Sequence, residues 1–202
     1  QAQLDALSEY LSSGVLALGP GGEEGSAEGS EESEGRLEAA LKFIDEKSPQ
    51  HDDEKVARIV MRCVLNAAVE GDEAPAAARI CKQIDRCAKL LKKCTSSQAA
   101  PKRLVKQAGC LYEVQAFCHS KSWPAGLMKK LFYNLYESDV VFEDAYGVWR
   151  EDVNDQTPGK DKALFQVSAP LASLECSSCA LTVMPSVPPL PPLIPSALPL
   201  HR

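Results

Sequence analysis

The sequence predicts an all-α protein, and two observations support that prediction. Apolar residues recur every three or four positions through most of the first 168 residues, the spacing that places them on one face of a helix. No stretch shows the alternation of apolar and polar residues that is typical of a half-buried strand. Prolines and glycines stand between the periodic segments, where helices usually begin or end.

The amino-terminal part is divided by an acidic segment. Residues 1–18 form the first expected helix, with Leu4, Leu7 and Leu11 on one face. Residues 19–35 are rich in glycine, serine and glutamate and contain no large apolar side chain, so we expect a disordered acidic loop there. The start at Gln1 instead of Met suggests a fragment of a longer protein.

The segment 36–168 is expected to form one helical domain. Its periodic stretches are short and are joined by short loops, which favours antiparallel helix pairs stacked as an alpha-solenoid of HEAT type. Two short helices are expected near its end, at about 140–150 and at 160–167. The apolar faces of the five earlier helices are expected to be Leu37, Leu41 and Ile44; Val56, Ile59, Val60, Cys63, Val64 and Ala67; Ile80, Ile84, Cys87, Leu90 and Leu91; Leu104, Val105, Ala108, Leu111, Val114 and Cys118; and Leu127, Leu131 and Leu135.

Composition argues against several classes of protein. No run approaches the roughly 18 apolar residues that a membrane span needs. A net charge of −6 argues against a nucleic-acid binder. Six of the eight cysteines lie within helical patterns, as expected for reduced, buried thiols in a cytoplasmic protein. No nucleophile, base and orienting group can be assembled, so we expect neither an enzyme nor a cofactor or metal site.

The segment richest in side chains that could bind a partner is 135–149, which we call the acidic/aromatic box. It interleaves four carboxylates with four aromatic residues. On a helix the aromatic side chains would anchor inward while the carboxylates stand in solvent. The acidic residues around Asp139 would also suit the positive amino-terminal end of that helix. Such a surface can dock a basic segment in a salt-sensitive way, although a solvated helix without a partner fits the pattern too. The expected partner-binding residues are Tyr136, Glu137, Asp139, Phe142, Glu143, Asp144, Tyr146 and Trp149.

The box resembles the first acidic/aromatic box of the HEAT-like domain that ends eukaryotic translation initiation factor 4 gamma. Related domains end initiation factor 5 and the epsilon subunit of the exchange factor for initiation factor 2. Gly159-Lys160 and Ala163-Leu164 also look like the linker into the last helix of that family. The matching residues of the box are Leu135, Tyr136, Asp139, Val140, Val141, Glu143, Asp144 and Trp149.

The resemblance implies a non-catalytic scaffold module in translation initiation. In the 4 gamma branch it implies docking of the kinases that phosphorylate the cap-binding protein, through a basic stretch of the kinase. In the other branches the same surface binds the beta subunit of initiation factor 2, which also offers lysine blocks. The resemblance implies no small-molecule substrate, no direct contact with nucleic acid and no membrane.

The sequence departs from the family after Val167. The family continues there with a second acidic/aromatic box, whereas here the proline-rich segment 169–202 follows, with 8 of the 14 prolines of the chain. We expect an irregular tail. Losing the second box removes half of the acidic surface, so the chain could also be a truncated isoform that binds nothing.

Three weaker patterns could also carry function. Cys176 and Cys179 have the spacing of a redox or zinc pair, but no second pair of ligands lies nearby. The run Pro188-Pro189-Leu190-Pro191 resembles a ligand of WW domains. The basic helix at 82–93 is a second candidate binding surface, or simply a solvated face.

Overall fold

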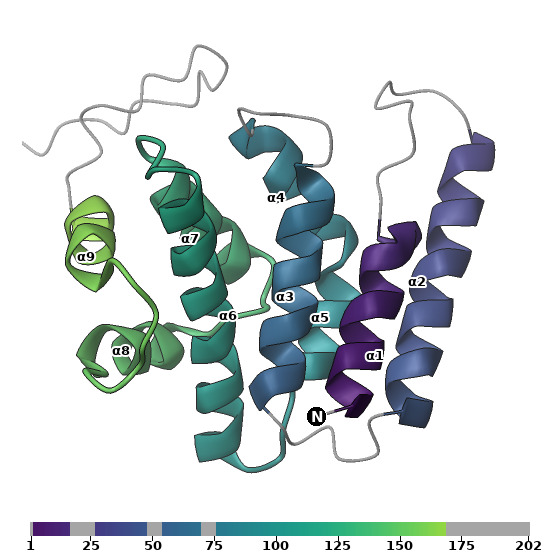
Figure 1. The fold of residues 1–202 in the computed structure, drawn as a ribbon, viewed down its shortest axis with the longest axis horizontal. Helices are drawn as coiled ribbons and strands as arrows, with labels where there is room; N and C mark the ends of the chain where they lie inside the picture. Colours follow the sequence, from purple (N-terminus) through teal and green to yellow (C-terminus); the bar gives the residue numbers. More distant parts are fainter. Residues whose placement is uncertain (1, 17–26, 48–53, 70–75, 169–202) are drawn as a thin grey trace, which may run out of the picture. The chain divides into compact units, whose positions relative to one another are not determined.

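The computed structural model describes residues 2–16, 27–47, 54–69 and 76–168, all within one compact unit that spans residues 1–169 (Figure 1). The described part contains helices and no strand, which confirms the predicted all-α class. Residues 19–26 of the expected acidic loop and the expected proline-rich tail lie outside the described residues. The helices are α1 (Ala2–Tyr10), α2 (Ala27–Lys47), α3 (Glu54–Ala68), α4 (Ala77–Arg86), α5 (Ala88–Thr95), α6 (Ala100–Ser120), α7 (Leu127–Glu137), α8 (Glu143–Glu151) and α9 (Lys160–Ser168), with a short π-helical turn at Leu11–Val15 after α1.

The first helix is shorter than predicted because the chain bends at Gly14. Gly14 adopts the left-handed conformation with φ +89°, which glycine takes without strain, and Ser13 Oγ donates to the Tyr10 carbonyl oxygen at 2.7 Å. The bend turns Leu16 inward, so that Leu7, Leu11 and Leu16 are all buried. This segment packs against α3.

The second helix begins earlier than the sequence predicts. We expected a loop up to residue 35, but α2 is helical from Ala27. Alanine and glutamate make up four of the six residues 27–32, and both are good helix formers, with glutamate further favoured near a helix start. Further along α2, Ala40 and Ile44 are buried and Leu37 and Leu41 are partly buried, as predicted.

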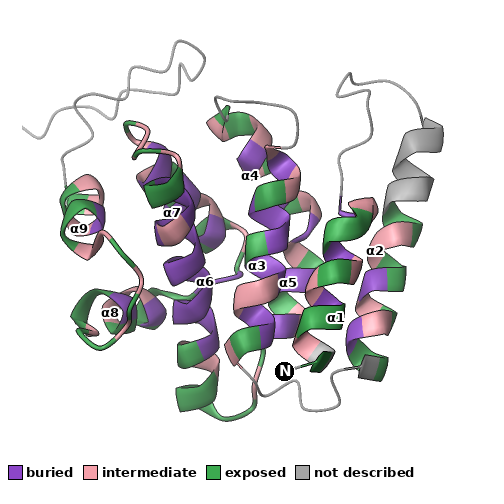
Figure 2. Ribbon diagram, viewed as in Figure 1, coloured by how far each residue is buried: buried purple, intermediate pink, exposed green. Residues whose placement is uncertain are grey.

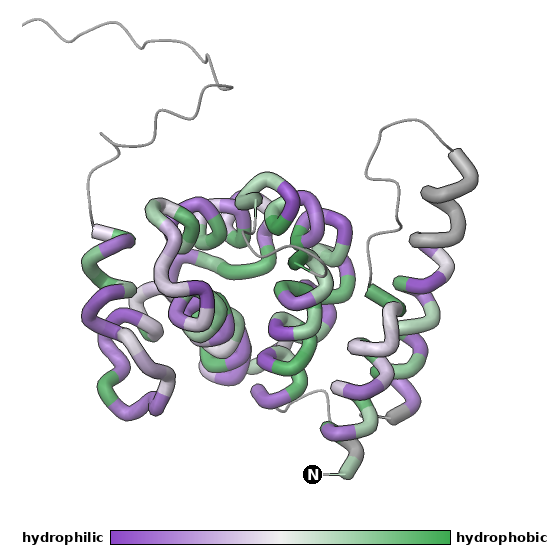
Figure 3. The backbone as a smooth tube through the Cα atoms, turned by 45° about the horizontal axis from the view of Figure 1, so that its top comes forward, coloured by the Kyte–Doolittle hydropathy of each residue, from purple (hydrophilic) through white to green (hydrophobic). Residues whose placement is uncertain are grey.

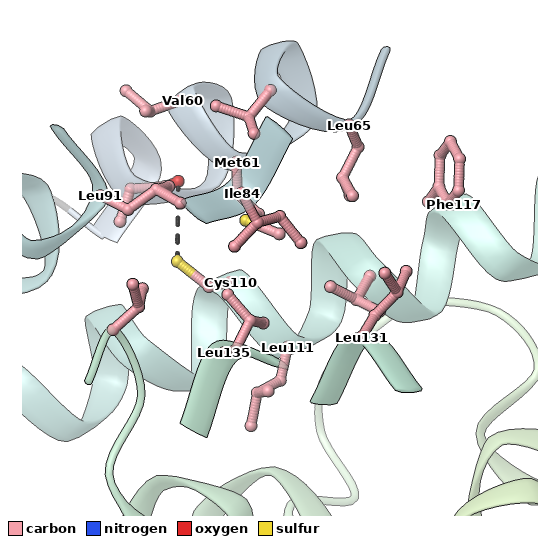
Figure 4. Packing of buried hydrophobic residues seen from close by; sticks show 14 of the residues in the cluster. Val60, Met61, Leu65, Ile84, Leu91, Cys110, Leu111, Phe117, Leu131 and Leu135 are labelled. Atoms are coloured by element: carbon pink, nitrogen blue, oxygen red, sulfur yellow. Dashed lines mark hydrogen bonds between the residues drawn. The ribbon is translucent and has the colours of Figure 1, made fainter. Parts of the chain in front are cut away.

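The core lies between α3 and α6, which make the most extensive helix contact in the unit. Figure 4 shows Val60, Met61 and Leu65 of α3 facing Cys110 and Phe117 of α6, whereas Leu111 points away from α3. Each helix turns its buried residues toward its neighbours (Figure 2), and apolar and polar stretches alternate along the tube in Figure 3, as amphipathic helices require. Ile84 of α4, Leu91 of α5 and Leu131 and Leu135 of α7 complete this cluster.

The predicted basic helix is two helices, α4 and α5, with a bend at Cys87. Cys87 has φ −89° and ψ 7°, outside regular helix geometry. The bend lets the apolar faces of both short helices reach the core, so Ile84, Cys87 and Leu91 are each fully buried. Gln83 is buried beside the bend and donates from Nε2 to the Leu16 carbonyl oxygen at 2.7 Å.

The long helix α6 faces inward through slightly different residues than predicted. Val105, expected to face the core, is exposed. The inward face passes instead through Lys106 and Gln107, which are both buried; Lys106 Nζ donates to the Ser96 carbonyl oxygen at 3.0 Å. The rest of the predicted inward face of α6 is found, since Leu111, Val114 and Cys118 are buried.

The last three helices cover the other side of the α3–α6 core from α1 and α2 (Figure 1). α8 packs on α6, and α9 packs on α7. α9 lies where the sequence predicts it, whereas α8 begins at Glu143 instead of at about 140. Within the described part of the chain, no helix is both long enough and apolar enough to cross a bilayer.

Candidate partner-binding surface

The box begins with a capped helix end. Asp139 N donates to the Tyr136 carbonyl oxygen at 3.0 Å, and Val140 N donates to the Leu135 carbonyl oxygen at 3.1 Å. This pair of bonds is the Schellman motif, and the buried Val140 and Leu135 supply its usual apolar contact. Asp139 therefore occupies the left-handed position of the cap, with φ +51°, where glycine is commonest. Its carboxylate belongs to the end of α7, so our placement of Asp139 at the start of the next helix is wrong.

The link between α7 and α8 is bound to two other helices. Val140 and Val141 are fully buried. Thr95 Oγ1, at the end of α5, donates to the Leu91 carbonyl oxygen at 2.9 Å and lies 3.4 Å from the Val140 carbonyl oxygen. Phe142 N donates to Gln107 Oε1 of α6 at 3.2 Å. These contacts set the backbone from which the exposed residues of the box project.

Two of the four aromatic residues anchor the box. Trp149 is only 2% exposed; its Nε1 donates to Gln115 Oε1 at 3.0 Å, and the edge of its ring system meets Phe132 with 5.0 Å between centroids. Tyr146 is partly buried, and its hydroxyl donates to the Phe132 carbonyl oxygen at 2.7 Å. Burial raises the pKa of the Tyr146 hydroxyl, so it stays protonated. The predicted anchoring role is therefore found at Tyr146 and Trp149.

The other two aromatics face solvent together with the carboxylates. Tyr136 is 51% exposed and Phe142 is 44% exposed, so the expectation that all four rings point inward is wrong for these two. All four carboxylates of the box are exposed. Glu143 and Asp144 form the first turn of α8, where the helix dipole favours negative charge. The exposed set is thus Tyr136, Glu137, Asp139, Phe142, Glu143 and Asp144.

Two cations border the acidic surface. Lys92 Nζ of α5 lies 3.7 Å from Asp139 Oδ2, and the Arg103 guanidinium of α6 lies over the Phe142 ring with 5.6 Å from Cζ to the ring centroid. A surface pocket of about 470 Å³ opens at this border. Its lining residues are Lys92, Thr95, Ser96, Ser97, Arg103, Gln107, Asp139 and Phe142.

The buried side of α8 is fixed by the linker to α9. Gln115 Nε2, behind Trp149, donates to the carbonyl oxygens of Thr157 and Pro158, each at 3.0 Å. Lys160 Nζ lies 4.2 Å from the Trp149 ring centroid and donates to the Trp149 carbonyl oxygen. Burial lowers the pKa of the Lys160 ammonium.

The basic helix pair is a weaker candidate surface. Lys89 lies 3.6 Å from a Glu34 carboxylate oxygen, and Lys93 pairs with Asp45, so two of its lysines already face acidic side chains of α2. With Lys92 also beside Asp139, these contacts favour a solvated, ion-paired face over a second docking site.

The cysteines of the described part are free thiols within the fold. Five of them are buried, Cys81 is partly buried, and none of the six forms a disulfide. Among the described residues no group of three or more histidine, cysteine or acidic side chains could hold a metal ion. Cys176 and Cys179 and the proline run at 188–191 lie outside the described residues.

Sequence reasoning missed the buried polar residues that hold the box. Gln107 and Gln115 stand two turns apart on the inward face of α6 and bond to Phe142 and Trp149. A glutamine within an otherwise apolar stripe needs a hydrogen-bond partner when buried, and that pattern could have identified both. Thr95 carries no such pattern, because the residues after it favour a loop.

Comparison with known proteins finds a matching family model and relatives that are similar to part of the chain. A family model described as W2: eIF4-gamma/eIF5/eIF2-epsilon matches residues 106–177, which include most of α6 and all of α7, α8 and α9. Eukaryotic translation initiation factor 4 gamma 2 of Mus musculus is 39% identical over 69 residues, and the proteins of that name from Homo sapiens and Bos taurus are 38% identical over 69 residues. The match takes in 34% of this chain and only 8% of each relative. Residues 106–177 therefore carry a W2 helical domain, of the kind described for eIF4-gamma, eIF5 and eIF2-epsilon.

Proposed function

We propose that this chain is a non-catalytic protein-binding module of translation initiation in the cytoplasm, and that its acidic/aromatic box docks a basic segment of a partner. The observation that carries the proposal is the exposure of four carboxylates around Tyr136 and Phe142, on a backbone fixed by buried neighbours. The W2 match and the names of the relatives support the assignment to initiation. The family resemblance favours a lysine-rich stretch of the kinase that phosphorylates the cap-binding protein, or of an initiation-factor subunit.

The chemistry of the surface suits a lysine- or arginine-rich partner. Carboxylates clustered within about one Debye length, roughly 8 Å at physiological salt, act together on an incoming cation. Within the described part of the chain, Glu143 and Asp144 have no ion-pair partner, so their charge is available. The exposed rings of Tyr136 and Phe142 can contact ammonium or guanidinium groups through cation–π interaction.

The test removes charge without disturbing the fold. A variant with Glu143→Gln and Asp144→Asn, and a second with Asp139→Asn, are titrated by calorimetry with a lysine-rich peptide at two salt concentrations. We expect the double variant to bind at least about tenfold more weakly, equivalent to about 1.4 kcal/mol, and to lose most of its salt dependence. Asparagine is chosen at position 139 because its short side chain tolerates the left-handed backbone there better than lysine does.

The matched control is Glu38→Gln, which removes one exposed carboxylate from α2, outside the box. It should bind the peptide as the unmodified chain does, and circular dichroism should show the same helicity for all variants. If the double variant and the control bind equally well, the box is not the docking site.

A further inference from the structure

We propose that the pocket beside Phe142 makes the box selective for a mixed-charge protein segment, in which an acidic residue accompanies the basic ones. The basic side chains would meet Asp139 and Glu143, and the acidic side chain would enter the pocket toward Arg103 and Lys92. This inference rests on the proposed function, because it specifies the kind of segment that the box accepts.

The arrangement of charge around the pocket is the first support. The pocket has a volume of about 470 Å³ and is lined by two cations, Lys92 and Arg103, and by one carboxylate, Asp139. The ring of Phe142 also lines it, and two further carboxylates of the box, Glu143 and Asp144, follow directly in the sequence. A segment carrying only lysine or arginine would bring like charges to Lys92 and Arg103, and like-charge juxtaposition is what suppresses wrong partners at interfaces.

Arg103 supplies the second support. Its Nε is buried and has no hydrogen-bond acceptor. Its charged group lies over the Phe142 ring, and within the described part of the chain no carboxylate pairs with it. Arg103 lines the pocket, so the charge of its guanidinium is available to an acceptor that a bound segment brings there. A carboxylate suits a guanidinium best, because the two groups match in planar, two-pronged geometry.

Lys92 supplies the third support. Its side chain is 47% exposed, and the 3.7 Å separation between Nζ and Asp139 Oδ2 is long for a hydrogen-bonded ion pair. An exposed pair of this kind is weak, so Lys92 can turn from Asp139 toward an incoming carboxylate. That exchange would release Asp139 for a basic side chain of the same segment, which couples the two charges of the ligand.

The experiment compares two peptides of equal length in calorimetric titrations. One carries lysines only at its charged positions; the other replaces one central lysine by glutamate. Simple attraction to an acidic surface predicts tighter binding of the all-lysine peptide, because its net charge is greater. The mixed-charge pocket predicts the opposite order, with the glutamate peptide binding at least about threefold more tightly to the unmodified chain.

Protein variants assign the preference to the pocket. Arg103→Gln and Lys92→Met should each remove the preference for the glutamate peptide while leaving the all-lysine peptide bound as tightly or more tightly. Arg103→Lys, which keeps the charge, should retain part of the preference and guards against an effect of misfolding. Lys162→Gln, an exposed position on α9, is the matched control and should leave both affinities unchanged.

The outcomes separate this inference from the function on which it rests. Tighter binding of the all-lysine peptide, or an equal loss for both peptides in Arg103→Gln, overturns the pocket's role and leaves the acidic box as a general basic-segment site. If neither peptide shows salt-sensitive binding, the proposed function fails and the mixed-charge preference fails with it.

Discussion

At the scale of single residues, the contact between Gly159 and Trp123 explains why the linker before α9 needs glycine. Gly159 has φ +79°, and a Cβ placed on it would lie 2.3 Å from Trp123 Cζ2. Trp123 and its neighbour Ser122 themselves have positive φ angles in the turn between α6 and α7. Two unusual backbone turns therefore touch at this point, and a side chain at position 159 would be both strained and in collision with Trp123.

We expect Gly159→Ala to lower the free energy of unfolding by roughly 2–5 kcal/mol, since a left-handed alanine costs about 1–2 kcal/mol and forced overpacking about 1–3 kcal/mol more. The matched control is Gly147→Ala in α8, where a Cβ would meet no atom within 4 Å. Alanine is the better helix former there and should be neutral or stabilising by up to about 1 kcal/mol. Urea unfolding followed by circular dichroism measures both, and equal effects would contradict the steric explanation.

Asp155 gives a pH-dependent prediction. Burial alone would raise the pKa of its carboxyl, but hydrogen bonds from Thr157 and Arg58 and the charge of Arg58 outweigh burial and lower it. A carboxyl whose pKa is lower in the folded state stabilises the fold above its unfolded pKa of about 3.9, and this contribution is lost as the pH falls through the folded value.

We therefore expect Asp155→Asn to cost roughly 1–3 kcal/mol near pH 7, because it removes a charged hydrogen bond to Arg58. The difference from the unmodified chain should shrink steadily below about pH 4. Chemical unfolding at a series of pH values measures it. A difference that stays constant from pH 7 to pH 3 would show that the charge of Asp155 is not what stabilises the fold.

At the scale of helices, the local sequence pattern predicted which segments form helices better than it predicted where each helix begins and ends. The apolar stripe of α3 and the stripe Leu127, Leu131 and Leu135 of α7 could be assigned because periodicity alone decides which side of such helices is buried. The break at Cys87 could not be predicted, since nothing local to that residue disfavours a helix and the bend depends on packing against the core. The early start of α2 was missed because polar composition was interpreted as disorder although its helix propensity is good.

In the box, too, some features could be predicted from the sequence pattern and others depend on the three-dimensional structure. The exposed carboxylates and the anchoring by Trp149 follow from the sequence pattern, whereas the outward position of Tyr136 and Phe142 depends on the cap after α7. Asp139 in a left-handed position is rare enough that no periodicity predicts it.

That cap yields a prediction in which stability and binding separate. Asp139→Gly should leave the thermal midpoint unchanged or raise it, because glycine adopts the left-handed conformation without strain. Asp139→Ala should lower the free energy of unfolding by about 1 kcal/mol relative to Asp139→Gly. Both variants lack the carboxylate and should weaken binding of a lysine-rich peptide equally. Unequal binding would mean that the cap conformation, and not the charge at 139, governs recognition.

At the scale of the whole unit, the reactivity of the cysteine thiols measures how well the core excludes solvent. Burial raises the pKa of Cys87 to about 11 and those of Cys94 and Cys118 to about 12, so almost no thiolate is present at neutral pH. Among the cysteines of the described part, Cys81 is the one that is only partly buried, and Cys63 keeps 6% exposure.

We expect iodoacetamide at pH 7.5 to modify Cys81 long before Cys87, Cys94, Cys110 or Cys118 in the folded protein, because reaction needs both access and thiolate. Peptide mapping by mass spectrometry distinguishes these sites from the two cysteines near the carboxyl terminus. In denaturant all sites should react at similar rates. Rapid labelling of Cys110 without denaturant would show that the α3–α6 core opens readily.

Both tryptophans of the chain lie at the carboxyl-terminal end of the unit, one inside α8 and one in the turn beside Gly159. Tryptophan fluorescence consequently reports on one region of the unit. Its emission spectrum will change when α8 and α9 detach, and will hardly change when α1 and α2 unfold at the opposite side. A melting curve recorded by emission can thus precede one recorded by far-ultraviolet ellipticity, and the gap between them would measure how independently the W2 end of the molecule comes apart.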